Sequence, residues 1–313
     1  MDKISTIVFP GGFNWPLFAA TELGFFERER LDVSITPTPN SVYQMTSLIG
    51  GEFDIAMTAF DNVVAYRDGA TDAKASQQAD VVAVSGGDRG FLSLVSTAEF
   101  TDISSLKGHK VAVDALTTGY AFVLMDILAN FGLAKADVEF VKVGGVADRF
   151  KGLLKHDFDA TLLVSPFDLI ANAKGFRTLA SAFTQLGSYQ GVVAAVRRSW
   201  ALENRELLVR FIRAQVAGVQ WLYAPENRDE AIRILIKHLP QIGPELAQAS
   251  YAAMIDGNQG FQQDAAVDLE GMQTVLGLRR KYVESCQSGR QLSEYIDLSF
   301  YNDALQDERQ VIQ

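Results

Sequence analysis

Short apolar segments alternate with amphipathic segments over residues 1–200. Apolar runs bounded by glycine, proline or polar turn residues predict strands. We expect strands at 4–9, 31–36, 53–58, 81–85, 91–95, 110–113, 138–143, 160–164, 179–183 and 191–196. Most of the segments between them space their apolar residues as a helix does, and this alternation predicts an α/β fold.

Residues 102–132 show the pattern most clearly. A turn at Gly108 releases the strand 110–113, and a loop of small residues opens a helix that ends at Gly132. We expect the side-chain oxygen of Thr117 or Thr118 to cap this helix. Such a loop leaves backbone N–H groups at the carboxyl end of a sheet, where small ligands bind in open α/β folds. We interpret it as one half of a ligand cleft.

An internal repeat supplies the other half. Residues 31–33 (LDV) are similar to 136–138 (ADV), and 52–56 (EFDIA) to 157–161 (DFDAT), with the same offset of 105 residues. Two unrelated βαβα units can also look alike under a favourable shift, but the constant offset favours a true repeat. The prediction is two similar α/β lobes with a hinge and a cleft between them, whose first loops face each other.

The predicted lobes are discontinuous in sequence. Residues 1–88 and 192–313 form lobe 1, residues 89–191 form lobe 2, and the crossover is a strand pair made by 81–85 and 91–95. From Trp200 onward the pattern is helical, with apolar residues at helical spacing. We expect these C-terminal helices to pack on lobe 1 as a scaffold.

Charge and cysteine content exclude several classes of partner and of metal site. The chain of 313 residues carries 28 Lys and Arg against 38 Asp and Glu, a net charge of −10 that argues against nucleic-acid and anionic-membrane partners. The single cysteine, Cys286, excludes an intrachain disulfide and a thiolate zinc site, and neither a metal nor a cofactor is expected. No apolar run reaches the length of a membrane span, and no secretory signal is recognisable. We therefore expect a cytoplasmic protein, or a periplasmic one if Met1 replaces a removed signal.

Motifs typical of catalysis are missing from the sequence. It contains no Gly-x-Ser-x-Gly nucleophile elbow, no Walker loop and no dinucleotide-binding glycine motif after a strand. His109, His156 and His238 have no predicted carboxylate or cysteine partner, so we expect them on the solvated surface. Cys286 is expected to be a structural thiol on a late helix. We therefore assign no catalytic residue.

Aromatic and small polar residues at loop tips suit ligand binding. Rings facing each other across a cleft would stack on a planar molecule. The four candidates are Phe13, Trp15, Phe60 and Tyr120. Core or hinge packing is the alternative for all four; the loop positions of Trp15 and Tyr120 favour the cleft, and Phe13 and Phe60 fit either place equally.

Polar candidates accompany these rings. Thr117 and Thr118 could offer hydrogen-bond donors to an anion. Asn14 and Ser41 are weaker candidates for the same role. Charged and hydroxyl candidates after later strands are Asp61, Arg89, Ser165 and Asp168. The aspartates could accept hydrogen bonds from amines or amides, whereas Arg89 could pair with a carboxylate or sulfonate. Because these signs conflict, charge alone leaves the ligand open.

Three motifs together resemble a known family. Residues 18–26 (FAATELGFF) leading to 31–33 (LDV), residues 51–56 (GEFDIA) and residues 103–113 (ISSLKGHKVAV) are similar to motifs of the type II periplasmic binding protein fold. The similarity is to its aliphatic-sulfonate and thiamine-pyrimidine-precursor branch, and it covers most of residues 1–200.

The resemblance implies the solute-binding component of an ABC importer, a monomer that closes on its ligand by hinge motion and delivers it to a permease. It implies a cleft lined by 13–15, 41, 60–62, 117–120 and 165–168. The implied ligand is a small planar or aromatic molecule: an aromatic acid, a sulfonate or a pyrimidine-like compound. The alternative is an enzyme of the same fold, desulfinase-like or pyrimidine-synthase-like; the cleft cysteine or cysteine-rich motif of those relatives is not found.

Overall fold

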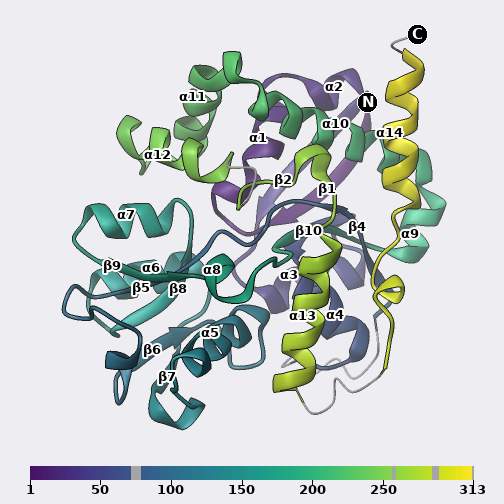
Figure 1. The fold of residues 1–313 in the computed structure, drawn as a ribbon. Helices are drawn as coiled ribbons and strands as arrows, with labels where there is room; N and C mark the ends of the chain where they lie inside the picture. Colours follow the sequence, from purple (N-terminus) through teal and green to yellow (C-terminus); the bar gives the residue numbers. More distant parts are fainter. Residues whose placement is uncertain (72–78, 256–258, 284–288, 312–313) are drawn as a thin grey trace.

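Two α/β lobes lie side by side, and most of the C-terminal helices lie beside the first (Figure 1). The computed structural model describes residues 1–71, 79–255, 259–283 and 289–311. Cys286, expected to be a structural thiol, lies outside the described residues. In the described ranges, no helix combines the length and apolar character needed to cross a bilayer.

The sheet of lobe 1 has five strands in the order β2-β1-β3-β10-β4. Its strands are β1 (Asp2–Val8), β2 (Leu31–Pro37), β3 (Ile55–Ala59), β4 (Val81–Gly86) and β10 (Val192–Arg197). Strand β1 runs parallel to β2 and β3, whereas β10 runs antiparallel to β3 and β4.

The sheet of lobe 2 has five strands in the order β7-β6-β8-β5-β9. Its strands are β5 (Leu92–Ser96), β6 (Lys110–Val113), β7 (Glu139–Lys142), β8 (Ala160–Val164) and β9 (Arg177–Ser181). Here β6 is parallel to β7 and β8, and β5 is antiparallel to β8 and β9. The two expected crossover strands are present as β4 and β5, but they do not pair with each other, because each hydrogen-bonds within a different sheet.

The sequence repeat is also a structural repeat. The Asp54 carboxylate accepts a hydrogen bond from the Ser5 backbone N–H at 2.8 Å, and that of Asp159 accepts one from the Lys110 backbone N–H at 2.8 Å. Both pairs are related by the offset of 105 residues found in the sequence. Each bond ties the start of the third strand of a βαβαβ unit to its first strand, which explains why an aspartate occurs at both positions.

Within the described ranges, eight α-helices belong to the lobes, and turn chemistry sets several of their ends. They are α1 (Trp15–Glu22), α2 (Phe25–Arg28), α3 (Ser41–Gly50), α4 (Phe60–Asp68), α5 (Gly119–Asn130), α6 (Val146–Leu154), α7 (Phe167–Ala173) and α8 (Ala182–Leu186). Asn40 caps α3 by accepting from the Tyr43 N–H at 2.8 Å. Gly108 and Gly132 adopt the left-handed conformation, with φ of 79° and 77°, as their turn roles require.

The C-terminal helices connect the lobes. They are α9 (Arg198–Glu203), α10 (Arg205–Tyr223), α11 (Arg228–His238), α12 (Pro244–Met254), α13 (Leu269–Tyr282) and α14 (Ser299–Val311). Helix α10 packs against α1 and α14, but α13 contacts both α4 of lobe 1 and α5 of lobe 2 (Figure 1). Helix α12 also contacts α7 of lobe 2. The expected packing on lobe 1 therefore describes α10, α11 and α14, whereas α12 and α13 also contact lobe 2.

Short 3-10 helices complete the described secondary structure. Their bounds are Gly12–Asn14, Ser104–Leu106, Lys135–Asp137, Pro225–Asn227, Gln263–Ala265 and Leu292–Glu294. The first of them lies between β1 and α1, and it shapes the loop that enters the cleft.

Candidate ligand-binding site

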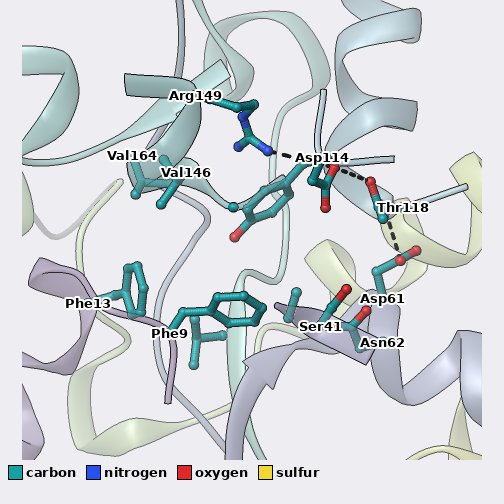
Figure 2. Close-up of a pocket in the computed structure, with 15 residues that line it drawn as sticks. Phe9, Phe13, Ser41, Asp61, Asn62, Asp114, Thr118, Val146, Arg149 and Val164 are labelled. Carbon is teal, nitrogen blue, oxygen red and sulfur yellow. Dashed lines mark hydrogen bonds and ion pairs between the residues drawn. The ribbon is translucent and has the colours of Figure 1, made fainter. Parts of the chain in front are cut away.

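A cavity lies between the two lobes (Figure 2). Lobe 1 contributes Phe9, Phe13, Ser41, Ala59, Asp61, Asn62 and Val192. Lobe 2 contributes Asp114, Thr118, Gly119, Tyr120, Gly145, Val146, Arg149 and Val164. Many of these residues follow the carboxyl ends of parallel strands, where open α/β sheets bind ligands. We call this space the interlobe cavity.

Apolar side chains form two walls of the interlobe cavity. The rings of Phe9 and Phe13 lie on the lobe 1 side, and Val146 and Val164 lie across from them on the lobe 2 side (Figure 2). Tyr120 adds a third half-buried ring. Burial raises the pKa of its phenol, so Tyr120 stays a neutral hydrogen-bond donor. The walls suit a flat molecule.

Arg149 and Asp114 form a polar corner of the interlobe cavity. Arg149, on α6, is 2% exposed; its Nη1 donates to the Gly144 carbonyl at 3.1 Å and its Nη2 to the Leu162 carbonyl at 3.3 Å. Nη1 also lies 3.7 Å from Oδ1 of Asp114, which accepts a hydrogen bond from the Thr118 hydroxyl. Burial lowers the pKa of the Arg149 guanidinium because desolvation disfavours its charged form. The corner is therefore a largely balanced ion pair.

Asp61 joins both lobes and helix α13. Its Oδ1 lies 2.8 Å from Nη1 of Arg279, which is fully buried, and its Oδ2 accepts from the Gly119 N–H at 2.8 Å. Arg279 also donates to the Ala70 carbonyl at 2.8 Å, and its guanidinium lies 5.5 Å from the Phe122 ring centre. A Cβ on Gly119 would come within 2.5 Å of the Asp61 Cβ, so this approach requires glycine. We call Asp61, Gly119 and Arg279 the interlobe clasp.

The clasp corrects two expectations. Asp61 lines the interlobe cavity, but its carboxylate oxygens already accept hydrogen bonds from Arg279 and from the Gly119 N–H, so a ligand amine would have to compete with these two donors. Thr118 is the residue before α5, but its hydroxyl bonds to Asp114 instead of capping the helix. The first backbone N–H of α5 is capped by Asp61 from the other lobe.

Trp15 and Phe60 lie in the core of lobe 1, which contradicts the cleft position favoured for Trp15 and selects the core alternative for Phe60. Trp15 is 0% exposed because α1 already begins at this residue and its side chain turns toward the C-terminal helices. Its Nε1 donates to the Ala231 carbonyl at 3.1 Å, and its ring meets Tyr251 edge-on at 5.9 Å. Phe60 begins α4, is 0% exposed, and packs edge-on against Tyr295.

Asn14 and Thr117 lie just outside the interlobe cavity. The Asn14 amide nitrogen donates to the carbonyls of Phe9 and Gly11, so this side chain holds the loop in place. Thr117 lines a small adjoining hollow, which it shares with Ser41 and other residues. Of the expected contacts, the structure brings Phe13, Ser41, Asp61, Thr118 and Tyr120 together in the cavity.

Arg89, Ser165 and Asp168 line a separate hollow, not the interlobe cavity. The Asp168 carboxylate accepts from the Ser165 hydroxyl at 2.8 Å and the Ser93 hydroxyl at 2.9 Å, and burial raises its pKa. Arg89 lies 3.7 Å from the Asp268 carboxylate. Ser165 and Asp168 follow β8, but their side chains point toward Ser93 on β5 and away from the interlobe cavity.

Phe9, Asp114 and Arg149 line the interlobe cavity but are not among the candidates expected from the sequence. Phe9 and Asp114 directly follow β1 and β6, so the rule that ligands bind at the carboxyl ends of strands could have found them. Arg149 lies within the amphipathic helix α6, where an arginine usually faces solvent. Its burial is decided by the packing of α6 on β8.

Residues 14–228 match the family described as NMT1/THI5 like. The chain belongs to the NMT1/THI5-like family. No curated protein matches its sequence.

Solved structures share the fold of this NMT1/THI5-like protein. The alkanesulfonate-binding protein SsuA from Xanthomonas axonopodis pv. citri superposes with a TM-score of 0.74 at 14% identity, covering 97% of this chain and 98% of that one. The nitrate-binding protein NrtA from Synechocystis PCC 6803 superposes with a TM-score of 0.80 at 14% identity, covering 98% of this chain and 89% of that one. A ligand-binding component of an ABC-type import system from Staphylococcus aureus, solved with zinc bound, superposes with a TM-score of 0.80 at 12% identity. The match covers 97% of this chain and 99% of that one. These likenesses confirm the two-lobe periplasmic-binding-protein fold.

Two histidines of this NMT1/THI5-like protein do have carboxylate neighbours, which corrects the expectation. His109 Nδ1 lies 3.4 Å from the Asp159 carboxylate, and His238 Nε2 lies 2.9 Å from that of Glu22. Among the described residues, no group of three or more His, Cys, Asp and Glu side chains is arranged to hold a metal ion.

Asp88 ties together the two segments that cross between the lobes. Its carboxylate accepts from the Gly90 N–H at 2.7 Å and the Val192 N–H at 3.4 Å, and its backbone carbonyl accepts from the Gly191 N–H at 2.9 Å. The residue is 2% exposed, and burial raises the pKa of its carboxyl group to about 7. The crossing therefore contains an acid that titrates near neutral pH.

Asp88 is expected to make stability decrease as pH rises from about 4 to about 7. In this range the folded protein keeps a proton that the unfolded chain, with a pKa near 3.8, has released. Its contribution changes by at most about 1.4 kcal/mol per pH unit and is constant above the folded pKa. Urea unfolding at pH 5 and pH 7.5 should show this loss in the wild type and a smaller loss in Asp88→Asn. Equal losses would show that Asp88 does not titrate there.

Proposed function

We propose that this protein is the solute-binding component of an ABC importer and that its ligand binds in the interlobe cavity. The observation that carries the proposal is the lining itself, since side chains from both lobes surround one space at the ends of parallel strands. A permease would be its partner, and the proposal places the protein outside the cytoplasm. The alkanesulfonate- and nitrate-binding structures that share the fold support this role.

The lining favours a planar, uncharged molecule that carries hydrogen-bonding groups along one edge. Arg149 faces Asp114 and Arg279 faces Asp61, so both guanidinium groups near the cavity already have an anionic partner. A sulfonate or carboxylate would have to compete with these aspartates. The Ser41 and Tyr120 hydroxyls make no hydrogen bond to any described residue, so they remain for a polar ligand edge, while Phe9 and Phe13 cover its faces. Aminopyrimidines have this chemistry.

A thermal-shift panel tests the proposed function. The protein is heated with neutral aminopyrimidines, with benzoates and with arylsulfonates, and each compound is recovered and analysed after long incubation. We expect the aminopyrimidines to raise the unfolding temperature by several degrees and to be recovered unchanged. A preference for the anions would overturn the charge argument, consumption of a compound would establish an enzyme, and no shift with any class would contradict the proposal.

Phe13→Ala is expected to weaken ligand binding about tenfold. The substitution removes a ring from the cavity wall, and an aromatic contact contributes about 0.5–1.5 kcal/mol beyond its buried area. Phe131→Ala is the matched control, because Phe131 is 41% exposed at the end of α5 and does not line the cavity. Calorimetric titration should separate the two variants. Equal affinities would remove Phe13 from the site.

A further inference from the structure

Helix α13 begins at the chain segments that cross between the lobes. The backbone N–H of its N-cap residue, Asp268, donates to Oε1 of Gln190 at 2.7 Å, and the Asp268 carboxylate accepts from the Ser188 hydroxyl. A Cβ on Gly271 would come within 2.5 Å of the Gln190 backbone nitrogen, so the helix approaches this segment closely. Ser188 and Gln190 lie in the segment that leads from lobe 2 to β10 of lobe 1. This end of α13 is therefore fixed where the lobes would rotate about each other.

The other half of α13 is attached to lobe 1 through a buried ion pair. Arg279 is fully buried, and it donates to the Asp61 carboxylate and to the Ala70 carbonyl, both at 2.8 Å. The helix also packs against α4 of lobe 1 (Figure 1). Separating a buried ion pair is costly, because each charge loses its partner in surroundings that solvate it poorly. We therefore expect α13 to move with lobe 1.

The last turn of α13 contacts lobe 2 through more exposed groups. Lys281 Nζ and the Tyr282 hydroxyl both donate to Oδ1 of Asp126 on α5, the hydroxyl at 2.9 Å. The Tyr282 ring stacks on Phe122 of α5, with the ring centres 5.7 Å apart. The Lys281 side chain is 54% exposed and Tyr282 is half-buried, so water can replace these partners. Separating such contacts costs less than separating the buried pair.

We infer that Asp126, Lys281 and Tyr282 form a latch that holds the two lobes closed and parts when α5 moves away from the end of α13. The inference rests on the hinge motion of the proposed function and names the contacts that give way. The latch lies about 20 Å along α13 from Asp268, by the rise per residue of an α-helix. A modest rotation at the crossing therefore separates it. Because the latch bonds form only in the closed protein, they favour closure whether or not a ligand is bound.

The backbone amide of Gly119 reports closure without any ligand. Its N–H donates at 2.8 Å to Asp61, which belongs to the other lobe. Gly119 is the first residue of α5, and the first N–H groups of a helix have no acceptor within that helix. Once the lobes part, this amide is open to exchange with solvent deuterium. Its exchange rate, followed by NMR, therefore measures the fraction of molecules that are open.

Asp126→Ala is expected to raise the exchange rate of the Gly119 amide about fivefold, because it removes the acceptor of both latch donors. Lys281→Met should give a smaller rise. In the Asp126→Ala protein the same lysine substitution should add little, because its partner is already gone. Lys151→Met is the matched control: the Lys151 side chain is 70% exposed, and its pair with Asp148 lies within α6. We expect this control to leave the Gly119 rate unchanged.

Other amides separate the release of the latch from unfolding. The Phe122 N–H donates to the Thr118 carbonyl at 3.1 Å at the start of α5, and the strand β6 pairs with its neighbours within lobe 2. These amides should keep their wild-type exchange rates in every variant. A rise at Phe122 by the same factor as at Gly119 would mean that α5 frays, and a rise in β6 would mean global destabilisation; either result would overturn the latch.

Two further results would also contradict the latch. One is a Gly119 amide that is unprotected in the wild type, because the lobes would then already be apart. The other is a Gly119 rate that Asp126→Ala leaves unchanged, because α13 would then stay with lobe 2 as the lobes open. Both results would leave the proposed function intact, since that is tested separately by the thermal-shift panel.

Discussion

Replacing Arg279 by methionine is expected to lower the free energy of unfolding by about 3–5 kcal/mol. Arg279 is fully buried and lies 2.8 Å from the Asp61 carboxylate, so methionine would leave that carboxylate buried without its cation. The Ala70 carbonyl would also lose a donor. The loss should appear in urea unfolding followed by circular dichroism. Arg279 lies on the C-terminal helix α13, so the same variant tests whether this helix holds the lobes together.

Two further variants control the Arg279 experiment. Arg233→Met removes an arginine that is 71% exposed and paired with Glu230 on the surface of α11, and we expect a change within about 0.5 kcal/mol. The double variant Asp61→Asn with Arg279→Met leaves no charge uncompensated, so it should be more stable than Arg279→Met alone. A loss below about 1 kcal/mol for Arg279→Met would mean that water or another cation compensates Asp61.

Trp15→Ala is expected to destabilise the protein by about 3–5 kcal/mol. Trp15 is 0% exposed and packs among α1, α11 and α12, so alanine would leave a large void in the core. The Ala231 carbonyl would lose the indole N–H as well. The measurement is again urea unfolding. Ligand affinity at a temperature where the variant remains folded should change much less than in Phe13→Ala, because Trp15 does not line the interlobe cavity.

Trp15→Phe separates packing from hydrogen bonding. Phenylalanine keeps most of the ring volume and loses the donor to Ala231, so we expect a smaller loss than for alanine. Leu202→Ala is the surface control, since Leu202 is 61% exposed, and it should change stability little. A Trp15→Ala protein with wild-type stability and weakened ligand binding would restore Trp15 to the cleft.

The interlobe clasp and Asp88 join the two lobes at different places. Asp61 and Gly119 connect the start of α4 in lobe 1 to the start of α5 in lobe 2, and Asp88 ties the crossing segments. Under the proposed function, opening of the lobes by hinge motion has to break the hydrogen bond between Asp61 and Gly119. No side chain can be added at Gly119 without displacing Asp61.

Local chemistry in the sequence was enough to place the elements. Apolar runs gave strands whose bounds differ from the structure by two residues or fewer, and Gly108 and Gly132 lie at turns as expected. The constant offset of the repeat was confirmed by the matching bonds of Asp54 and Asp159. These features depend on backbone conformation and on contacts within one βαβ unit, which the local sequence controls.

The sequence by itself determined the fold class, the two lobes and the loops that meet between them. Only the tertiary structure decided which side chains of those loops reach the cavity. Phe13 and Trp15 are two residues apart, and the point at which α1 begins turns one ring into the cavity and the other into the core. Likewise, Asp61 is satisfied by Gly119 and by Arg279, 218 residues away in sequence. Side-chain direction and charge pairing depend on elements that are distant in sequence, and no local pattern encodes where those elements pack.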